Sequence, residues 1–344
     1  MFIKRVISLI LVLSLLMGVA AGCGGSQTEN PANTDQQGST SQDDQTDGTG
    51  DGSQSGGSTD STTQTGNSDT ATEGGTGSNL PPVAAEKKMV TNKDKIKVLC
   101  IGHSFSNNST KYASQLVADF GGNLEISSLY YAGCTLEQHY NFYTNDEAVF
   151  HLFTNGQQVT TEKVTSKWVL ENHDYDIITF QGNSVTMDEI ETFDMLVPLY
   201  EKVKAHQPNA KYMIHQTWSL CWRRNMGRYP ASNMGRDQFE KVKANFKIAS
   251  DRLGGVPIVP VGEAVQLAKE EYGFTNDYDK TTSIYADEVS HLSEKGCFLA
   301  ACVWAQFLYK DEIDVRQNTV SGYGGTKAER QKLAEVAYRI VMGY

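Results

Sequence analysis

Five short apolar runs alternate with amphipathic helical patterns between residues 96 and 341. Runs of this length that are rich in β-branched residues are typical of strands buried on both faces. Strands that alternate with helices form βαβ units, and such units build a parallel sheet with helices on both faces. The predicted strands cover residues 96–101, 123–131, 177–180, 211–215 and 256–260. The sequence therefore predicts an α/β fold, a three-layer α/β/α sandwich around a central parallel sheet.

Polar or glycine-containing turns follow four of the five predicted strands. They cover residues 102–106, 132–135, 181–184 and 215–219. The carboxyl ends of parallel strands lie along one edge of a sheet, and ligands of open α/β sheets bind at that edge. We therefore expect the four turns to converge on one site.

The first turn contains Ser104, and a helical pattern follows it with Ser109 or Thr110 as the expected N-cap. A serine between a strand and a helix lies near the helix N-terminus. Backbone N–H groups and the helix dipole stabilise a developing negative charge there. Ser104 is therefore a candidate nucleophile, and the alternative is that it only caps the helix.

A second polar stretch, residues 287–296, contains His291. Asp287 precedes this histidine by four positions and Glu288 precedes it by three. A carboxylate at such a spacing can orient an imidazole that serves as base to a distant serine. Both acids remain candidates for this task. The alternative for His291 is a surface residue that caps the helix expected from Cys297.

The amino end has the pattern of a secretory signal. Basic residues come first, residues 6–17 form an apolar run too short for a typical membrane-spanning helix, and small residues lead to Cys23. A cysteine in this place resembles the lipobox of bacterial lipoproteins, in which it is lipidated and becomes the new N-terminus. We expect a lipoprotein signal peptide at residues 1–22, and a protein anchored through Cys23 to the membrane at the bacterial cell surface, outside the cytoplasm. Ordinary cleavage nearby is the alternative.

Residues 24–82 contain no lysine, no arginine and no aromatic residue. Such a segment buries too little apolar surface to offset its ordering entropy. We therefore expect a lipidated cysteine and disordered spacer over residues 23–85 and one folded domain over residues 86–344. The spacer carries nine acidic residues and the signal carries two basic ones, so the formal net charge of −11 leaves about −4 for the folded part. That balance argues against a nucleic-acid partner, which needs a basic patch.

Five cysteines lie in the predicted domain, and none has the spacing of a Cys-x-x-Cys motif or a zinc site. They are Cys100, Cys134, Cys221, Cys297 and Cys302. We expect Cys100 and Cys302 to be buried thiols, whereas Cys134 and Cys297, beside the two candidate turns, are a possible disulfide outside the cytoplasm. The histidines are scattered and form no His-Glu-x-x-His motif, so we expect no metal and no cofactor.

At these turns the chain resembles the SGNH (GDSL-type) hydrolase superfamily over residues 95–310. Within it, the chain looks like a bacterial lipoprotein branch described as a domain of unknown function. Members place a serine in a Gly-Asp-Ser turn after the first strand, which matches Gly102-His103-Ser104. A glycine after the second strand matches Gly133, a Gly-x-Asn-Asp turn is best matched at Asn183, and Asp-x-x-His is matched at His291. The resemblance implies a flavodoxin-like three-layer fold.

The resemblance also implies acyl transfer through an acyl-enzyme. Ser104 would attack an ester carbonyl, His291 would accept and return the proton, and Asp287 or Glu288 would orient the imidazole. Three groups would hold the oxyanion: the backbone N–H groups of Ser104 and Gly133 and the side-chain amide of Asn183.

Four further residues in or beside the turns are candidates for substrate binding, because polar and aromatic side chains suit a carbohydrate. They are His103, Gln181, Gln216 and Trp218. The alternative for the tryptophan is a place in the core.

We expect a cell-surface serine esterase that hydrolyses ester bonds, with O-acetylated carbohydrate as substrate, since the resemblance and the predicted tether both favour an extracellular polysaccharide. One alternative is a lipase or thioesterase with the same chemistry. The other is a catalytically silent glycan-binding lipoprotein on the same fold.

Overall fold

The computed structural model describes residues 79–221, 228–229, 231–278 and 280–344. The predicted signal peptide, Cys23 and the spacer as far as residue 78 lie outside the described residues. In the described part of the chain, no helix is both long enough and apolar enough to cross a membrane.

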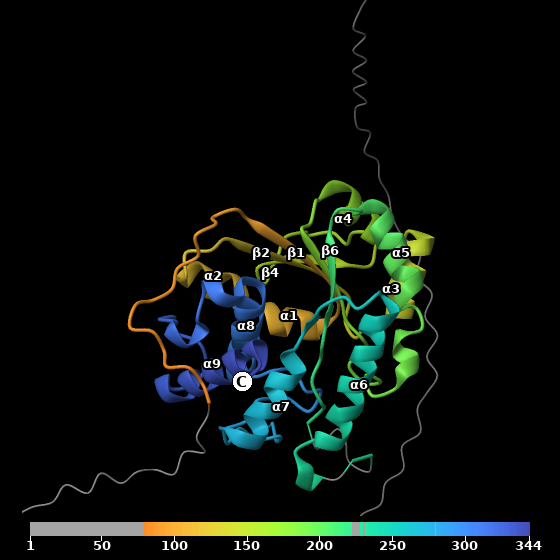
Figure 1. Cartoon of the computed structure of the whole chain (residues 1–344). Coiled ribbons are helices and arrows are strands. Elements are labelled where there is room, and N and C mark those ends of the chain that lie inside the picture. The colour runs from red at the N-terminus through yellow and green to blue at the C-terminus, as the bar shows by residue number, and fades with distance from the viewer. Residues whose placement is uncertain (1–78, 222–227, 230, 279) are drawn as a thin grey trace, which may run out of the picture. The chain divides into compact units, whose positions relative to one another are not determined.

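The first described segment, residues 79–95, runs over the surface of the folded part and is drawn in orange in Figure 1. Arg316 donates a hydrogen bond to the carbonyl oxygen of Pro81 over 2.8 Å. Lys87 forms an ion pair with Asp119 over 2.6 Å. These contacts attach the segment to the folded part.

A seven-stranded sheet forms the middle layer, with the strand order β4-β3-β2-β1-β5-β6-β7. Five strands are parallel: β1 (Ile96–Gly102), β2 (Leu124–Tyr130), β5 (Ile177–Phe180), β6 (Lys211–His215) and β7 (Ile258–Val259). β1 lies between β2 and β5, and Val98 pairs with Ile126 on one side and Ile177 on the other. These strands confirm the predicted α/β fold.

An antiparallel hairpin extends the sheet beyond β2, so the sheet is not parallel throughout. The hairpin consists of β3 (His151–Thr154) and β4 (Gln157–Gln158). Its loop residues, Asn155 and Gly156, have φ angles of 50° and 78°. Positive φ at both central positions is the requirement of a type I′ turn, for which Asn-Gly is the preferred sequence.

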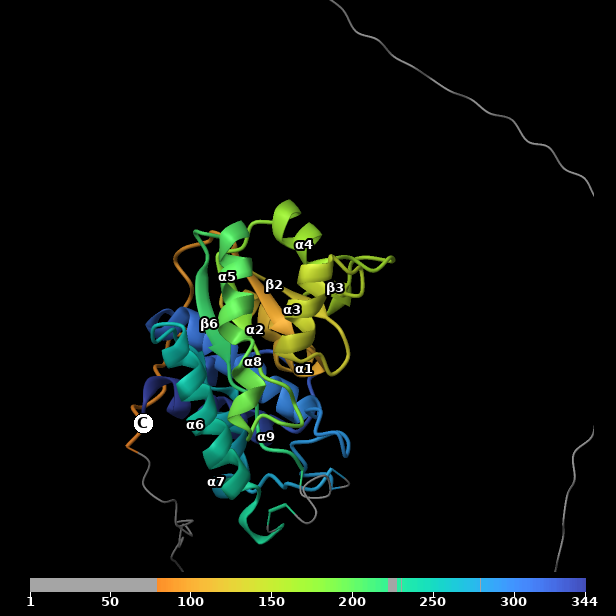
Figure 2. The same cartoon turned by 90° about the vertical axis from the view of Figure 1, so that its right-hand side faces the viewer.

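Helices cover both faces of the sheet, as the three-layer prediction requires (Figures 1 and 2). On one face, α8 contacts α1, α2, α7 and α9, and on the other face α3, α4 and α5 contact one another. The first group is α1 (Ser104–Thr110), α2 (Ala113–Asp119), α7 (Val261–Glu271), α8 (Glu294–Tyr309) and α9 (Lys327–Met342). The second group is α3 (Leu136–Asn145), α4 (Ser166–Asn172) and α5 (Leu196–His206), with α6 (Arg236–Arg252) beside it.

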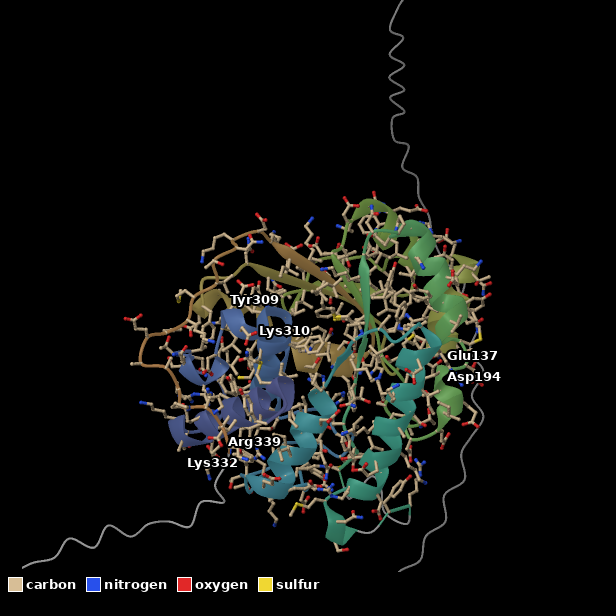
Figure 3. The ribbon with its side chains drawn as sticks, viewed as in Figure 1. Glu137, Asp194, Tyr309, Lys310, Lys332 and Arg339 are labelled. Carbon is tan, nitrogen blue, oxygen red and sulfur yellow. The ribbon has the colours of Figure 1, made fainter. Side chains whose placement is uncertain are left out.

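The helix layers have a buried interior and a charged outer surface. Residues 297–305 of α8, which packs against α9 and β7, are at most 2% exposed. Charged side chains point outward instead, among them Lys332 and Arg339 of α9 and Glu137 of α3 (Figure 3). This division is what helices that cover a buried sheet require.

The start of α1 differs from the prediction. The helix begins at Ser104 rather than after Ser109 or Thr110. The reason is that the His103 ring accepts a hydrogen bond from the Phe105 N–H over 3.3 Å, so a histidine acts as the N-cap.

The segment before α5 also differs from the prediction. The apolar spacing of residues 188–205 predicts one amphipathic helix, but the structure has a 3-10 turn, η1 (Ile190–Phe193), before α5. Pro198 lies in the first turn of α5, where its missing N–H is tolerated. Its ring would clash with a helix that continued from the preceding turn, so the helix is divided.

Candidate active site

Ser104 lies where β1 ends and α1 begins. As the first residue of α1, it has an N–H with no acceptor inside the helix. The preceding Gly102 is needed for the close approach of two strand-end turns. A Cβ atom at Gly102 would overlap the side chains of Gln181 and Ser106, so a larger residue would push the turns apart.

Ser104, His291 and Asp287 form a continuous hydrogen-bonded chain. The His291 Nε2 atom lies 2.8 Å from the Ser104 Oγ, across 187 positions of sequence. The His291 Nδ1 atom lies 2.7 Å from the Asp287 Oδ2, and the Asp287 Oδ1 accepts from the His291 N–H over 3.1 Å. Because the carboxylate accepts a hydrogen bond from Nδ1, the ring proton lies on Nδ1, and the lone pair of Nε2 faces the serine hydroxyl. The side chains of His291 and Asp287 are 30% and 42% exposed, so the chain is accessible from solvent.

Glu288, the second candidate acid, does not reach His291. Its side chain is exposed, and its backbone carbonyl accepts a hydrogen bond from the Cys221 thiol over 3.3 Å. Ser290 has a φ of 76°, a left-handed conformation that turns the chain back on itself. The structure therefore brings Asp287, four positions before the histidine, to the imidazole.

Gly133 and Asn183 lie together at the same edge of the sheet. The Asn183 side-chain amide donates to the Gly133 carbonyl over 3.1 Å. The Asn183 Oδ1 accepts from the N–H groups of Val185 and Thr186 over 2.8 and 3.3 Å, which fixes the amide orientation. Gly133 has a φ of 63°, and no atom lies within 4 Å of a Cβ built there, so backbone conformation rather than crowding favours glycine.

His103 and Gln181 hold the turns together and do not face a ligand. Both are at most 1% exposed. The His103 Nε2 donates to the Gly182 carbonyl over 3.1 Å, and the Gln181 Oε1 accepts from the Ser106 hydroxyl. Burial lowers the pKa of His103 to about 4, so the ring is neutral. The prediction that these two residues bind substrate is corrected to a structural role, because neither is accessible.

Gln216 and Trp218 are buried as well, so their predicted contact with substrate is also corrected. The Gln216 Oε1 accepts from the Glu263 N–H over 3.0 Å and so caps the first turn of α7. Trp218 is fully buried and stacks on Phe105, with ring centroids 4.4 Å apart. The core alternative for the tryptophan therefore holds.

Three residues that the sequence did not single out support the site. Phe105 lies between Trp218 and His291, with its ring centroid 5.9 Å from that of His291. Asn108 accepts from the Leu292 N–H over 3.1 Å and so joins α1 to the histidine turn. The His139 Nε2 donates to the Gly102 carbonyl over 3.0 Å.

A sequence signal was available only for Asn108. It lies four positions after Ser104, so the two share one face of the helix. The partners of Phe105 and His139 are distant in sequence, and no local pattern indicates them.

The five cysteines of the domain are free and buried. Cys134 and Cys297 form no disulfide, and burial raises the pKa of each thiol to about 12, so neither is a reactive nucleophile. The described residues contain no cluster of three or more histidine, cysteine or acidic side chains that could hold a metal ion.

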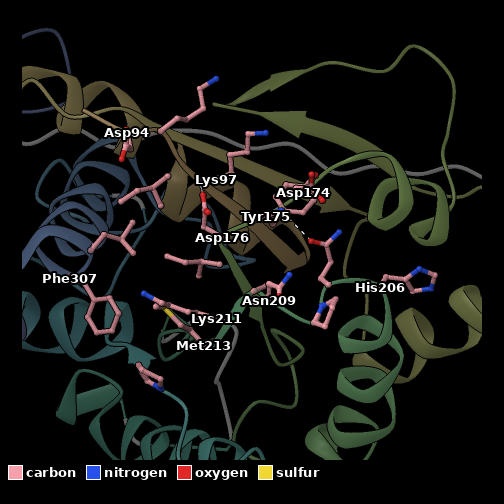
Figure 4. A pocket seen from close by; sticks show the side chains of 18 of the residues that line it. Asp94, Lys97, Asp174, Tyr175, Asp176, His206, Asn209, Lys211, Met213 and Phe307 are labelled. Atoms are coloured by element: carbon pink, nitrogen blue, oxygen red, sulfur yellow. Dashed lines mark hydrogen bonds between the residues drawn. The ribbon is translucent and has the colours of Figure 1, made fainter. Parts of the chain in front are cut away.

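A cavity of about 960 Å³ lies at the opposite end of the strands (Figure 4). Its lining includes Ile96, Ile177 and Lys211, which begin β1, β5 and β6, and no residue of the four strand-end turns. The cavity is therefore separate from the Ser104 site.

Known proteins resemble the chain at the level of family and fold. A family model described as a domain of unknown function (DUF4886) matches residues 97–339. The crystal structure of a DUF4886 family protein from Bacteroides uniformis ATCC 8492 has a TM-score of 0.62 and 22% sequence identity. That match covers 72% of this chain and 95% of the other. It confirms the fold, and the family match agrees with the expected family described as a domain of unknown function.

Two further structures match less closely. A carbohydrate esterase family 3 protein from Talaromyces cellulolyticus has a TM-score of 0.39 and 14% identity, over 63% of this chain and 98% of the other. A member of the lipolytic protein G-D-S-L family from Veillonella parvula DSM 2008 has a TM-score of 0.40 and 11% identity, over 62% of this chain and 99% of the other. No curated protein matches the sequence.

Proposed function

We propose a catalytic function for this chain, which belongs to the DUF4886 family: it is a serine hydrolase that cleaves ester bonds. One observation carries the proposal, namely the chain of hydrogen bonds from the Ser104 Oγ through His291 to Asp287, over 2.8 and 2.7 Å. A serine bonded to an imidazole that a carboxylate orients is the arrangement that activates a hydroxyl nucleophile.

In the proposed reaction, the Ser104 Oγ attacks the ester carbonyl carbon while its proton passes to the His291 Nε2. Asp287 stabilises the imidazolium through Nδ1 and keeps the ring in place. The imidazolium then gives the proton to the departing alcohol, which leaves an acyl-serine. Water, deprotonated by the same imidazole, attacks the acyl group and restores Ser104.

The negative charge on the carbonyl oxygen needs donors that are already in place. We assign this role to the backbone N–H groups of Ser104 and Gly133 and to Asn183. The Ser104 N–H has no acceptor within its helix, and the Asn183 amide carries two hydrogens, one of which binds the Gly133 carbonyl. Loss of one such donor typically raises the barrier by about 3 kcal/mol.

For the substrate, we propose an O-acetylated carbohydrate met outside the cytoplasm. The support is the secretory signal and Cys23 pattern at the amino end, together with the resemblance of the turns to SGNH hydrolases. We also propose that Cys23 anchors the protein to the membrane through a lipid.

The test of the chemistry is covalent labelling of the full-length protein with a fluorophosphonate, beside hydrolysis of p-nitrophenyl acetate. Wild-type protein should be labelled, and Ser104→Ala should lose both labelling and activity by several orders of magnitude. Wild-type protein that folds but takes no label would reject the esterase and favour a silent glycan-binding protein.

Asp287 and Glu288 provide a matched pair for the orienting carboxylate. Asp287→Ala should lower kcat by about 10²–10⁴-fold, because the imidazole loses the partner of its Nδ1. Glu288→Ala should stay within about twofold of the wild type, because its side chain is exposed and unbonded to the histidine. The reverse order of effects would refute the assignment.

A further inference from the structure

The turn that carries Asp287 and His291 is held from behind by the loop that follows β6. The Trp218 Nε1 donates to the Ser290 carbonyl over 2.8 Å. The Cys221 N–H donates to the Ser290 hydroxyl, also over 2.8 Å. Ser290 is fully buried and directly precedes the histidine, so its position fixes where the imidazole begins.

A buried tyrosine joins the same two segments two residues before Asp287. The Tyr285 hydroxyl donates to the Ser219 carbonyl over 2.6 Å, and Tyr285 is 1% exposed. Asp287 therefore lies between two anchor points, Tyr285 and Ser290, which both bind the loop after β6, and His291 directly follows the second.

Lys269 of α7 is 1% exposed and lies beside the hydrogen bond between Tyr285 and Ser219. Its ammonium group donates to the Ser219 hydroxyl over 2.8 Å and to the Tyr285 hydroxyl over 3.2 Å. It also donates to the Met234 carbonyl over 2.7 Å and to the Asn276 Oδ1 over 3.3 Å. One side chain thus connects four positions between residues 219 and 285.

The four oxygens around Lys269 can only accept from it. Two are carbonyl oxygens, from Met234 and the Asn276 side chain, and the Tyr285 hydroxyl already donates its hydrogen to Ser219. The Ser219 hydroxyl donates to Gln266. Because all four groups accept, they favour the charged ammonium, which carries three hydrogens, over the neutral amine, which carries two.

Burial lowers the pKa of Lys269 to about 7, and the nearby Glu270 carboxylate opposes that shift. The surrounding oxygens also favour the charged form, because each accepts from it. None of the four described groups that accept from this buried ammonium is a carboxylate, and a buried charge on such terms is costly.

We propose that Tyr285 and Lys269 are positioning residues for the Ser104 site: together they lock the Asp287–His291 turn onto the loop after β6. This inference rests on the proposed esterase function. Neither side chain touches the reacting atoms. Their effect is to keep the imidazole at hydrogen-bond distance from the serine, which is the quantity that governs proton transfer.

The decisive experiment compares Tyr285→Phe with Tyr212→Phe in the full chain. Tyr212 of β6 is the matched control, since its buried hydroxyl also donates to a backbone carbonyl, that of Gln207, over 2.7 Å, at the opposite end of the sheet. Each variant loses the bond that its hydroxyl donates, and Tyr285→Phe also loses the bond from Lys269, so its melting temperature should fall by the larger amount. The two readouts are the rate at which a fluorophosphonate labels Ser104 and the separate values of kcat and KM for p-nitrophenyl acetate.

Tyr285→Phe should slow labelling and lower kcat by about tenfold or more with KM nearly unchanged, whereas Tyr212→Phe should match the wild type in both. If the Lys269→Met variant folds, it should behave like Tyr285→Phe. If it does not fold, the comparison of the two tyrosine variants decides whether the proposal holds. Equal labelling rates in the two tyrosine variants would overturn the inference and leave the esterase intact. Wild-type protein that takes no label would instead reject the esterase itself.

Discussion

Acid should destabilise this domain, because three histidines are buried in their neutral form. His103, His139 and His215 are 0%, 2% and 0% exposed. Burial lowers their pKa values from 6.5 to about 4, about 4 and about 3. A histidine with a lowered folded-state pKa contributes stability that is fully present above its unfolded pKa. That contribution is lost as the pH falls from 6.5 toward the folded value of about 4 or 3.

The magnitude follows from the protons taken up on unfolding. At pH 5 an imidazole in the unfolded chain is almost fully protonated, whereas each of the three buried rings is mostly neutral. Integrating this difference from pH 7 to pH 5 gives a loss of about 2 kcal/mol for each ring, or about 6 kcal/mol for all three. That loss is comparable to the whole stability of many domains, about 5–15 kcal/mol.

His215→Leu isolates one of these contributions. Neither ring nitrogen of His215 has a hydrogen-bond partner among the described residues, so leucine leaves no partner group unpaired. The free energy of unfolding should then fall by about 4 rather than about 6 kcal/mol between pH 7 and pH 5. Urea unfolding followed by tryptophan fluorescence at the two pH values measures the difference.

His173→Gln is the control, because His173 is exposed. This variant should show the same acid-induced loss of stability as the wild type. The reasoning is refuted if His215→Leu loses as much stability as the wild type between the two pH values, since the buried ring would then not be the source of the loss.

Four further outcomes follow from the structure. Gly262→Ala should lower the melting temperature markedly, because a Cβ there would overlap the Thr217 carbonyl, and circular dichroism would show it. Asn183→Ala should lower kcat on p-nitrophenyl acetate by about 100-fold with little change in KM, and an unchanged kcat would remove Asn183 from the oxyanion site. His291→Ala should lower the initial rate by several orders of magnitude because Ser104 loses its proton acceptor, and an unchanged rate would argue against that role. Cys23→Ala should move the protein from the membrane fraction to the soluble fraction, whereas retention with unaltered mass would exclude a lipid on Cys23.

The sequence predicted the parts of the site that depend on local pattern. The strand, glycine and serine at the end of β1 indicated a nucleophile at Ser104, and the acid before a histidine in a polar turn indicated a base at His291. The alternation of strands and helices placed the Ser104 turn at the edge of a parallel sheet, whereas the His291 turn was brought to it only by the resemblance to a known family.

The choice between Asp287 and Glu288 could not be made in the same way. It depends on the left-handed conformation of Ser290, which is held by a buried contact with Cys221, a residue from another loop. Spacing alone does not reveal such a conformation. The start of α1 was missed for a similar reason, because a histidine is an uncommon N-cap and His103 was interpreted as part of a turn.

The burial of Trp218 was also beyond local reasoning. A tryptophan after a strand end suits a sugar platform as well as a core, and the deciding contact is the stacked ring of Phe105, more than a hundred positions earlier. Pro198, by contrast, is visible in the sequence, yet the apolar spacing of residues 188–205 predicted one helix across it, and the structure has a break before α5.

The separation of 187 positions between Ser104 and His291 orders events during synthesis. Ser104 emerges from the ribosome early, directly after the central strand of the sheet, while His291 comes late, just before α8. A nascent chain, or one cut short before the histidine, carries the serine without its proton acceptor and cannot hydrolyse an ester through this pair. In the exported protein that we propose, the pair of Ser104 and His291 therefore forms only when the last helices dock.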